Sequence, residues 1–377
     1  MPKISPSPLD DQRWMRAALL LARYGLGRTA PNPSVGCVLV RDGRLVGRGR
    51  TADGGRPHAE TQALASAGKH AKGATAYVTL EPCSHHGQTL PCADALIKAG
   101  IARVVIACGD PDDRVAGAGV EMLKAAGVAV DFGVCQDEGM AILAGYMHLR
   151  RHGRPLVTVK VASTLDGRIA LQDGRSKWIT GARTRAYVHQ LRAQHDVVMT
   201  ASGTVLADDP SLTCRLEGYD APQHLRAVVA SAPTLPKDSK LAESAKDGSV
   251  VLFTLSDAAM PKSMPETMPE SMPAEVHVHH VAAGEDGRPN LTNVLEHLGA
   301  LGKASVLVEA GGTFVASMLK QGLVDRLIWT RSSGVIGGDG LPSLANLGLG
   351  DLSDGRIFRR VASQIIDEDA IEVFHRL

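Results

Sequence analysis

The chain has 377 residues, more than the about 100 to 200 residues of one ordinary domain, so we expect two domains. Hydrophobic residues make up 44% and charged residues 21%, as in a soluble globular protein, and no apolar run approaches the roughly 20 residues that cross a bilayer. The 41 basic and 40 acidic residues leave a net charge of +1, which argues against a nucleic-acid surface and favours a small-molecule substrate.

The chain also carries compositional indications of where it works. Its first ten residues contain no basic segment followed by an apolar core, so they do not resemble a secretion signal. The six cysteines are scattered through a long chain, whereas disulfide frameworks crowd into short secreted ones. We therefore expect a cytoplasmic protein with free thiols, a pair of which binds a metal.

As far as Val134, short β-branched runs alternate with amphipathic stretches, a pattern typical of an α/β layered domain. We expect one sheet with helices on both faces. The predicted strands lie at 35–40, 77–80, 103–107 and 128–132. The predicted helices lie at 13–24, 58–67, 92–99 and 119–126.

A basic stretch at 148–155 contains glycine and proline, and a new strand begins at Leu156. We place the domain boundary there and expect domains at 1–149 and 150–377. The same alternation continues beyond the boundary, so the second domain is also predicted to be α/β. Its strands are expected at 156–161, 196–200, 226–230, 250–254 and 305–309, and its helices at 183–193 and 313–320.

Two segments of the second half have unusual compositions. Residues 256–275 contain a repeated Met-Pro unit with polar residues between, which neither pairs as a strand nor continues as a helix, so we expect a mobile surface loop. The histidines within 277–280 could suggest a metal, but their alternation favours a surface strand.

One set of His, Glu and Cys residues has the order of a catalytic metal site. His58 and Glu60 open a predicted helix, Cys83 follows a predicted strand, and Cys92 opens the next helix after Pro91. This order is the signature of zinc deaminases, in which three protein ligands leave a fourth position for water. Because zinc lowers the pKa of bound water to about 7, a nucleophile is available near neutral pH. We assign His58, Cys83 and Cys92 as zinc ligands and Glu60 as the general acid/base.

Other interpretations of the zinc pattern remain open. A zinc site that only stabilises the fold needs a fourth protein ligand, which His85 or His86 could supply, but we favour the interpretation that both are ordinary loop residues that shape the pocket. A non-catalytic zinc-binding module is a related alternative. A nucleic-acid base deaminase with an unrelated second domain is a third, but the near-neutral charge and 3% aromatic content argue against its basic, stacking groove.

Several longer motifs carry a resemblance to a known family. In the first half they are PNPSVGC at 31–37, PHAE at 57–60, YVTLEPCSHHG at 77–87 and DPDDRVAG at 110–117. In the second half they are KVASTLDGR at 160–168, SKWIT at 176–180, TVLADDPSLTCR at 204–215 and VEAGGT at 308–313. Over nearly its whole length the chain resembles the bifunctional riboflavin biosynthesis deaminase/reductases. The resemblance implies a cytidine deaminase-like three-layer domain followed by a dihydrofolate reductase-like α/β domain.

The resemblance also implies two consecutive reactions. The first is zinc-dependent deamination of 2,5-diamino-6-(5-phosphoribosylamino)pyrimidin-4-one at C2, with one zinc ion in each chain. The second is reduction of the ribosyl group to ribityl with NADPH. A homodimer or higher homo-oligomer through the second domain is implied as well. A monofunctional zinc deaminase of another nucleoside or nucleotide base is the alternative.

Carried over by position, the resemblance implies that Asn32 contacts the pyrimidine. The residues implied to bind the substrate of the reductase are Ser176, Arg192, Leu212, Arg215 and Glu309. The residues implied to bind NADPH are Ala162, Trp178, Thr204, Asp208, Ser231, Gly311, Gly312, Thr313, Phe314, Val315, Ala316 and Ser317.

Physical arguments support several of these roles. Arg192 and Arg215 offer the planar, bidentate donors that suit a ribose phosphate. The glycine pair 311–312 lies between a predicted strand and helix, where backbone N–H groups suit a cofactor phosphate, although a plain tight turn explains it equally well. Trp178 could stack on the cofactor or fill the core. The Gly-x-Gly within 115–120 lacks the third glycine of a dinucleotide fingerprint.

The chain also departs from the family pattern. Gln88 and Leu90 stand where family members often have a basic residue and a proline, and Arg56 stands where glutamate is usual. A basic residue near position 88 would help to hold the phosphate of the substrate.

Overall fold

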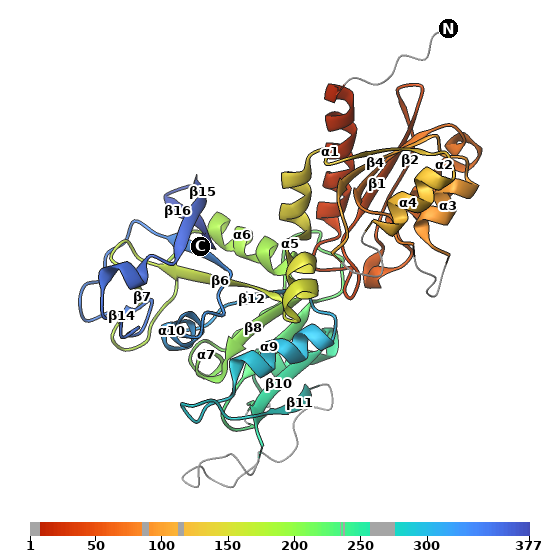
Figure 1. Ribbon diagram of the computed structural model, residues 1–377. Coiled ribbons are helices and arrows are strands. Elements are labelled where there is room, and N and C mark those ends of the chain that lie inside the picture. The colour runs from red at the N-terminus through yellow and green to blue at the C-terminus, as the bar shows by residue number, and fades with distance from the viewer. Residues whose placement is uncertain (1–7, 85–89, 112–116, 234, 237, 257–275) are drawn as a thin grey trace. The chain divides into compact units, whose positions relative to one another are not determined.

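The structure is a computed structural model that describes residues 8–84, 90–111, 117–233, 235–236, 238–256 and 276–377. The chain forms two compact units, an amino-terminal unit of residues 1–153 and a carboxyl-terminal unit of residues 154–377. Both are α/β (Figure 1). The sequence-based boundary between 149 and 150 falls within α5 (Gln136–His152), the last helix of the amino-terminal unit.

The amino-terminal unit is built on a five-stranded sheet with the order β2-β1-β3-β4-β5. Strand β1 is antiparallel to β2 and β3, while β3, β4 and β5 are mutually parallel. The strands are β1 (Gly36–Arg41), β2 (Arg44–Arg50), β3 (Thr75–Leu80), β4 (Arg103–Cys108) and β5 (Ala129–Phe132). Three parallel strands therefore end along the same edge of this sheet.

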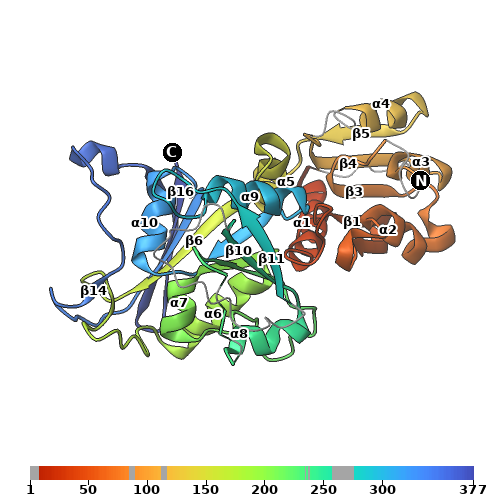
Figure 2. The same ribbon diagram turned by 90° about the horizontal axis from the view of Figure 1, so that it is seen from below.

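Helices cover both faces of this sheet, which confirms the three-layer expectation (Figure 2). Helices α1 (Pro8–Tyr24) and α5 pack together against β4 from one side. The second layer contains α2 (Ala59–Ala67), α3 (Cys92–Lys98) and α4 (Ala118–Ala125), together with the short 3-10 helix at Gly68–Ala71, and another 3-10 helix lies at Asp53–Gly55.

All four strands and four helices predicted for this part of the chain are present, but β2 and α5 were missed. Strand β2 is an edge strand rich in arginine and glycine, and Val46 is its single β-branched residue, so it lacks the run of such residues that identifies strands. Helix α5 buries Gly139, Leu143 and Met147, spaced four residues apart, and its polar residues lie mainly at its two ends.

The carboxyl-terminal unit contains a nine-stranded sheet with the order β11-β10-β9-β8-β12-β6-β13-β16-β15. The strands from β11 to β13 are parallel, and β16 and β15 add an antiparallel hairpin at one edge. The strands are β6 (Leu156–Ser163), β8 (Val197–Ala201), β9 (Leu225–Val229), β10 (Val250–Leu255), β11 (Val276–Val281), β12 (Ser305–Val308), β13 (Arg326–Arg331), β15 (Phe358–Ile366) and β16 (Asp369–Arg376). A separate two-stranded pair joins β7 (Arg168–Ala170) to β14 (Leu341–Pro342).

Helices again follow the strands in this unit. They are α6 (Ala182–Ala193), α7 (Ser202–Asp208), α8 (Lys240–Glu243), α9 (Leu291–Ala300) and α10 (Gly312–Lys320), with 3-10 helices at Ser244–Asp247 and Leu352–Gly355. Every strand and helix predicted for this half is present, and the histidines of 277–280 lie on β11, which confirms the surface-strand interpretation. The predicted Met/Pro-rich loop at 256–275 lies outside the described residues apart from Ser256.

Across the described segments, no helix is both long enough and apolar enough to span a membrane.

Helix α1 approaches β1 unusually closely at Gly36. A Cβ atom on residue 36 would lie 1.9 Å from the carbonyl oxygen of Ala18 and 2.9 Å from the backbone nitrogen of Ala22. The hydroxyl of Ser34 donates a hydrogen bond of 2.6 Å to the carbonyl of Ala22, so the loop before β1 is also tied to the helix. This packing holds the loop that carries Asn32.

This close contact predicts that adding one methyl group at residue 36 strongly destabilises the amino-terminal unit. Gly36→Ala is expected to lower the free energy of unfolding of the amino-terminal unit by about 1–3 kcal/mol, because neither backbone segment can move without disturbing the core. Chemical denaturation followed by circular dichroism measures the change. Gly338→Ala is the control, since a Cβ atom at residue 338 meets nothing within 4 Å. Equal stability of the two variants would contradict the packing argument.

Candidate active sites

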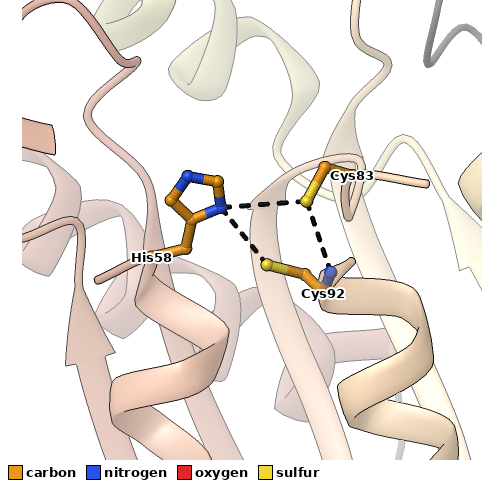
Figure 3. A group of neighbouring side chains, drawn as sticks. All are labelled: His58, Cys83 and Cys92. Carbon is orange, nitrogen blue, oxygen red and sulfur yellow. Dashed lines mark hydrogen bonds between the residues drawn. The ribbon is translucent and has the colours of Figure 1, made fainter. Parts of the chain in front are cut away.

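Three side chains that are distant in sequence meet at one edge of the amino-terminal sheet. His58 directly precedes α2, Cys83 lies beyond the end of β3, and Cys92 is the first residue of α3. The Nδ1 atom of His58 lies 3.3 Å from the Sγ of Cys92 and 3.8 Å from the Sγ of Cys83 (Figure 3). Within the described ranges, this is the one group of three or more His, Cys, Asp or Glu residues spaced to hold a metal ion.

The geometry of this group fits zinc. With Zn–S about 2.3 Å and Zn–N about 2.1 Å, tetrahedral coordination places nitrogen and sulfur ligands about 3.6 Å apart, between the two distances observed. The backbone N–H of Cys92 donates to the Sγ of Cys83 over 3.3 Å. Hydrogen bonds from Cys92 and His58 lower the pKa of the Cys83 thiol to about 4, so it is ready to act as a thiolate ligand.

A closed structural site requires a fourth protein ligand, and no further described His, Cys, Asp or Glu joins the three. His85 and His86, the alternative ligands, lie outside the described residues.

Glu60 stands beside this group of three residues without belonging to it. It is the second residue of α2, its exposed fraction is 4%, and it lines the same cavity of about 180 Å³ as His58 and Cys83. Burial and the negative charge of Cys83 raise the pKa of Glu60 to about 7. A carboxyl group of this kind can accept and release a proton near neutral pH.

The turn that carries Cys83 is held in place by the start of α4. The carboxylate of Glu81 accepts hydrogen bonds of 3.1 Å from the backbone N–H groups of Gly117 and Gly119. A Cβ atom on residue 119 would lie 2.1 Å from the carbonyl oxygen of Pro82. The Gly-x-Gly that lacks the rest of a dinucleotide fingerprint therefore allows α4 to pack against the turn that carries Cys83.

Polar side chains line the rest of this cavity. Asn32, the predicted pyrimidine contact, donates to a backbone carbonyl over 2.8 Å. Tyr146 donates a hydrogen bond of 3.0 Å to Asp110, and Arg56 and Arg150 are the arginines among the described lining residues. Sequence reasoning assigned no role to these last four. Asp110 lies just beyond the end of β4, a position at which it could have been found.

A larger cavity, of about 620 Å³, lies in the carboxyl-terminal unit where β8 and β12 end and α7 and α10 begin. At its wall Glu309 accepts hydrogen bonds of 2.5 Å and 3.1 Å from the guanidinium of Arg192. The Nζ atom of Lys160 lies 3.3 Å from the same carboxylate. Burial alone would raise the pKa of Glu309, but the charges of Arg192 and Lys160 lower it below its ordinary value. The result is an ionised carboxylate between two cations.

Lys160 was missed by the sequence assignment. It is the one charged residue of β6, whose sequence LVTVKVAS is otherwise apolar or small, and this interruption was the available signal.

Most residues predicted to bind the substrate and NADPH meet at the larger cavity. Ser176 donates a hydrogen bond of 3.2 Å to Asp208, and the backbone N–H of Gly311 donates to Thr204 over 3.2 Å. The predicted residues that line the cavity are Ala162, Ser176, Arg192, Thr204, Asp208, Leu212, Glu309, Gly311, Gly312, Thr313 and Phe314.

Other predicted residues lie elsewhere. Ser231 and Ser317 line an adjoining cavity of about 360 Å³, and Ala316 lines a third. Val315 is buried in the core, with an exposed fraction of 1%. The guanidinium of Arg215 donates to the hydroxyls of two neighbouring loop residues and does not line the cavity that contains Glu309.

Trp178 is exposed. Its exposed fraction is 72% and its ring packs against the guanidinium of Arg185 at 4.3 Å, so the interpretation that it fills the core is wrong.

Comparison with known proteins finds a different family match for each of the two units. Residues 155–359 match the family described as the RibD C-terminal domain, and residues 8–108 match the zinc-binding region of cytidine and deoxycytidylate deaminases. The riboflavin biosynthesis protein RibD of Escherichia coli K12 is 39% identical, with 93% of this chain and 95% of that protein covered. RibD of Aquifex aeolicus is 36% identical, with 97% and 98% covered.

Solved structures show the same similarity. RibD of Acinetobacter baumannii is 35% identical with a TM-score of 0.86, over 98% of this chain and 100% of that chain. The diaminohydroxyphosphoribosylaminopyrimidine deaminase/5-amino-6-(5-phosphoribosylamino)uracil reductase of Thermotoga maritima is 34% identical with a TM-score of 0.85, over 98% and 99%. Because these relatives match along nearly their whole length, this chain belongs to the RibD family of riboflavin biosynthesis proteins.

Proposed function

We propose that this chain catalyses two consecutive steps of riboflavin biosynthesis. The amino-terminal unit deaminates 2,5-diamino-6-(5-phosphoribosylamino)pyrimidin-4-one at C2, and the carboxyl-terminal unit reduces the ribosyl group to ribityl with NADPH. The observation that carries this proposal is the zinc-ligand group beside the buried Glu60, in one chain with a second cavity built around Glu309. The Thermotoga maritima relative bears both activities in its name.

In the deaminase site, zinc held by His58, Cys83 and Cys92 would supply Lewis acidity that lowers the pKa of a water ligand to about 7. Glu60 would accept a proton from the attacking water as the water oxygen bonds to C2. Glu60 would then give this proton to the amino nitrogen, which leaves as ammonia, while the other water proton passes to the ring nitrogen beside C2. Asn32 contacts the pyrimidine from the loop before β1 and so orients C2 towards Glu60.

In the reductase site, bound NADPH would supply the hydride that reduces the sugar carbon. Glu309 holds Arg192 and Lys160 in place at the cavity wall through ion pairs. Both cations can donate hydrogen bonds to oxygen atoms of the ribosyl phosphate. Gly311 and Thr313 lie at the start of α10, where backbone N–H groups favour a cofactor phosphate.

The chemistry of Glu60 can be tested within the bifunctional chain. Glu60→Gln is expected to lower the rate of ammonia release by about 10²- to 10⁴-fold, because the amide cannot carry the proton. Zinc content stays at one ion per chain, and NADPH oxidation with the deaminated ribosyl compound is unchanged. Glu121→Gln, which alters an exposed carboxylate on α4, is the control and should leave all three measurements unchanged.

Each alternative has its own outcome in these assays. Persistent ammonia release by the zinc-loaded Glu60→Gln protein contradicts the assignment of Glu60. A wild-type protein that binds zinc but releases no ammonia is a non-catalytic zinc module. Ammonia release without NADPH oxidation identifies a monofunctional deaminase.

The substrate carries a phosphate, and the deaminase cavity has to accommodate it. Gln88, at the position where a basic residue is usual, lies outside the described residues. Arg56 and Arg150 line the cavity together with Asn32 and Glu60. We assign the binding of the substrate phosphate to these two arginines, since one guanidinium group can donate two parallel hydrogen bonds to phosphate oxygens.

This assignment predicts a loss of affinity with little loss of turnover. Arg56→Gln and Arg150→Gln should each raise KM for deamination by about 10-fold or more, with kcat within about twofold, because the phosphate is remote from C2. Initial rates of ammonia release at varied substrate concentration measure both constants. Arg23→Gln, on the exposed side of α1, is the matched control. An unchanged KM in the double variant Arg56→Gln/Arg150→Gln would refute the assignment.

We further propose that the chain forms a homodimer through its carboxyl-terminal unit. Strand β15 is at the edge of the nine-stranded sheet, and most of its side chains are exposed. Among them, Ile365 has an exposed fraction of 69% and Val361 one of 44%. A long edge strand with exposed apolar residues favours pairing with another chain.

A charge on this strand should dissociate the dimer. Ile365→Asp is expected to convert a dimer into a monomer in light scattering coupled to size-exclusion chromatography, because two carboxylates would meet near the interface. Leu301→Asp, at an exposed apolar residue after α9, is the control and should remain dimeric. A monomeric wild-type protein, or a dimeric Ile365→Asp variant, contradicts the proposed interface.

The cytoplasm is the proposed place of action. All six cysteines are unpaired, which is usual in a reducing compartment. The zinc-binding thiols also have to stay reduced in order to bind metal.

A further inference from the structure

A reductase that uses NADPH has to distinguish it from NADH. The two cofactors differ only in the phosphate on the 2′-oxygen of the adenosine ribose, far from the nicotinamide. A protein that prefers NADPH therefore needs a group that recognises this dianion. The assignment of this group to a residue of this chain rests on the proposed reductase function.

The cavities of the carboxyl-terminal unit show how an extended cofactor fits. The cavity of about 620 Å³ contains Glu309, so the reacting nicotinamide end belongs there. The adjoining cavity of about 360 Å³ shares the wall formed by Gly203, Thr313 and Phe314. This shared wall includes the first turn of α10, where backbone N–H groups favour the pyrophosphate at the middle of the cofactor.

The adenosine end then enters the smaller cavity. Ser231 lines it just after the end of β9, and Arg288 and Pro289 line it from the turn between β11 and α9. Both segments lie beyond the carboxyl ends of parallel strands, where nucleotide ligands bind in open α/β sheets.

Arg288 is the single cationic side chain among the described residues that line the smaller cavity. It is exposed, and its backbone N–H donates to the carboxylate of Asp286 over 3.0 Å, which fixes the turn. Within the described part of the chain its guanidinium takes part in no ion pair, so the charge is available to a ligand. The hydroxyl of Ser231 lines the same cavity and can donate to the same anion.

We propose that Arg288, assisted by the hydroxyl of Ser231, binds the 2′-phosphate of NADPH and so sets the preference of the reductase for NADPH over NADH. The planar guanidinium can donate two parallel hydrogen bonds to the oxygens of the 2′-phosphate. NADH has a neutral hydroxyl at this position, so it offers the cation no opposite charge. Arg288 is a specificity residue because it does not reach the reacting carbon.

Kinetics of the full-length protein test the proposal directly. Arg288→Gln should raise KM for NADPH by about 10- to 100-fold, with kcat within about twofold and KM for NADH unchanged. Arg288→Lys should lie between the wild type and Arg288→Gln, because lysine keeps the charge but loses the paired geometry. The unchanged kcat and the unchanged KM for NADH show that the carboxyl-terminal unit of the variants is folded.

Lys320→Gln provides a matched control. Lys320 lines the third cavity together with Arg288 but does not line the cavity assigned to adenosine. Its removal deletes the same charge from the same surface, so its KM for NADPH should stay within about twofold of the wild type. An effect as large as that of Arg288→Gln would overturn the proposal in favour of a diffuse electrostatic attraction.

A binding measurement separates the role of Arg288 from the proposed catalytic function. Calorimetric titration with 2′,5′-ADP and with 5′-AMP compares ligands with and without the 2′-phosphate, and it requires no hydride transfer. Arg288→Gln should raise the dissociation constant of 2′,5′-ADP by about 10-fold or more and leave that of 5′-AMP unchanged. Equal weakening of both ligands, or of neither, overturns the assignment. A wild-type protein that binds 2′,5′-ADP but oxidises no NADPH instead refutes the reductase function.

Discussion

Parallel strands end along one edge of a sheet, and the helices that follow them begin at that edge with unpaired backbone N–H groups. Both sites of this chain depend on that constraint. Cys83 follows β3, and His58 and Cys92 stand at the starts of α2 and α3. Glu309 follows β12, and Gly311 precedes α10. The remaining helices and the apolar cores hold these edges in register.

The chain uses two buried glutamates in opposite ways. Glu60 is buried beside the Cys83 thiolate, and burial together with that charge raises its pKa to about 7. Glu309 is equally buried, but Arg192 and Lys160 lower its pKa. The first can therefore exchange protons near neutral pH, whereas the second is a fixed anion that orients cations. Environment, not residue type, separates the two roles.

Features encoded in short, regular patterns could be predicted from the sequence. The strands of both sheets consist largely of β-branched runs, and the order and residue types of His58, Cys83 and Cys92 are enough to indicate a zinc site. Features that depend on distant segments could not be predicted. Arg150 joins the deaminase cavity only because α5 returns across the sheet, and Trp178 is exposed although tryptophan is usually buried.

The order of strands has a consequence for synthesis on the ribosome. The amino-terminal unit is one continuous segment with its own core, so it can fold as soon as α5 has emerged. In the other unit β6 is made first, yet its neighbours in the sheet, β12 and β13, begin only at residues 305 and 326. The apolar strand β6 therefore stays unpaired during translation until almost the whole polypeptide has been made. The reductase half is therefore the half that most needs protection from aggregation during translation.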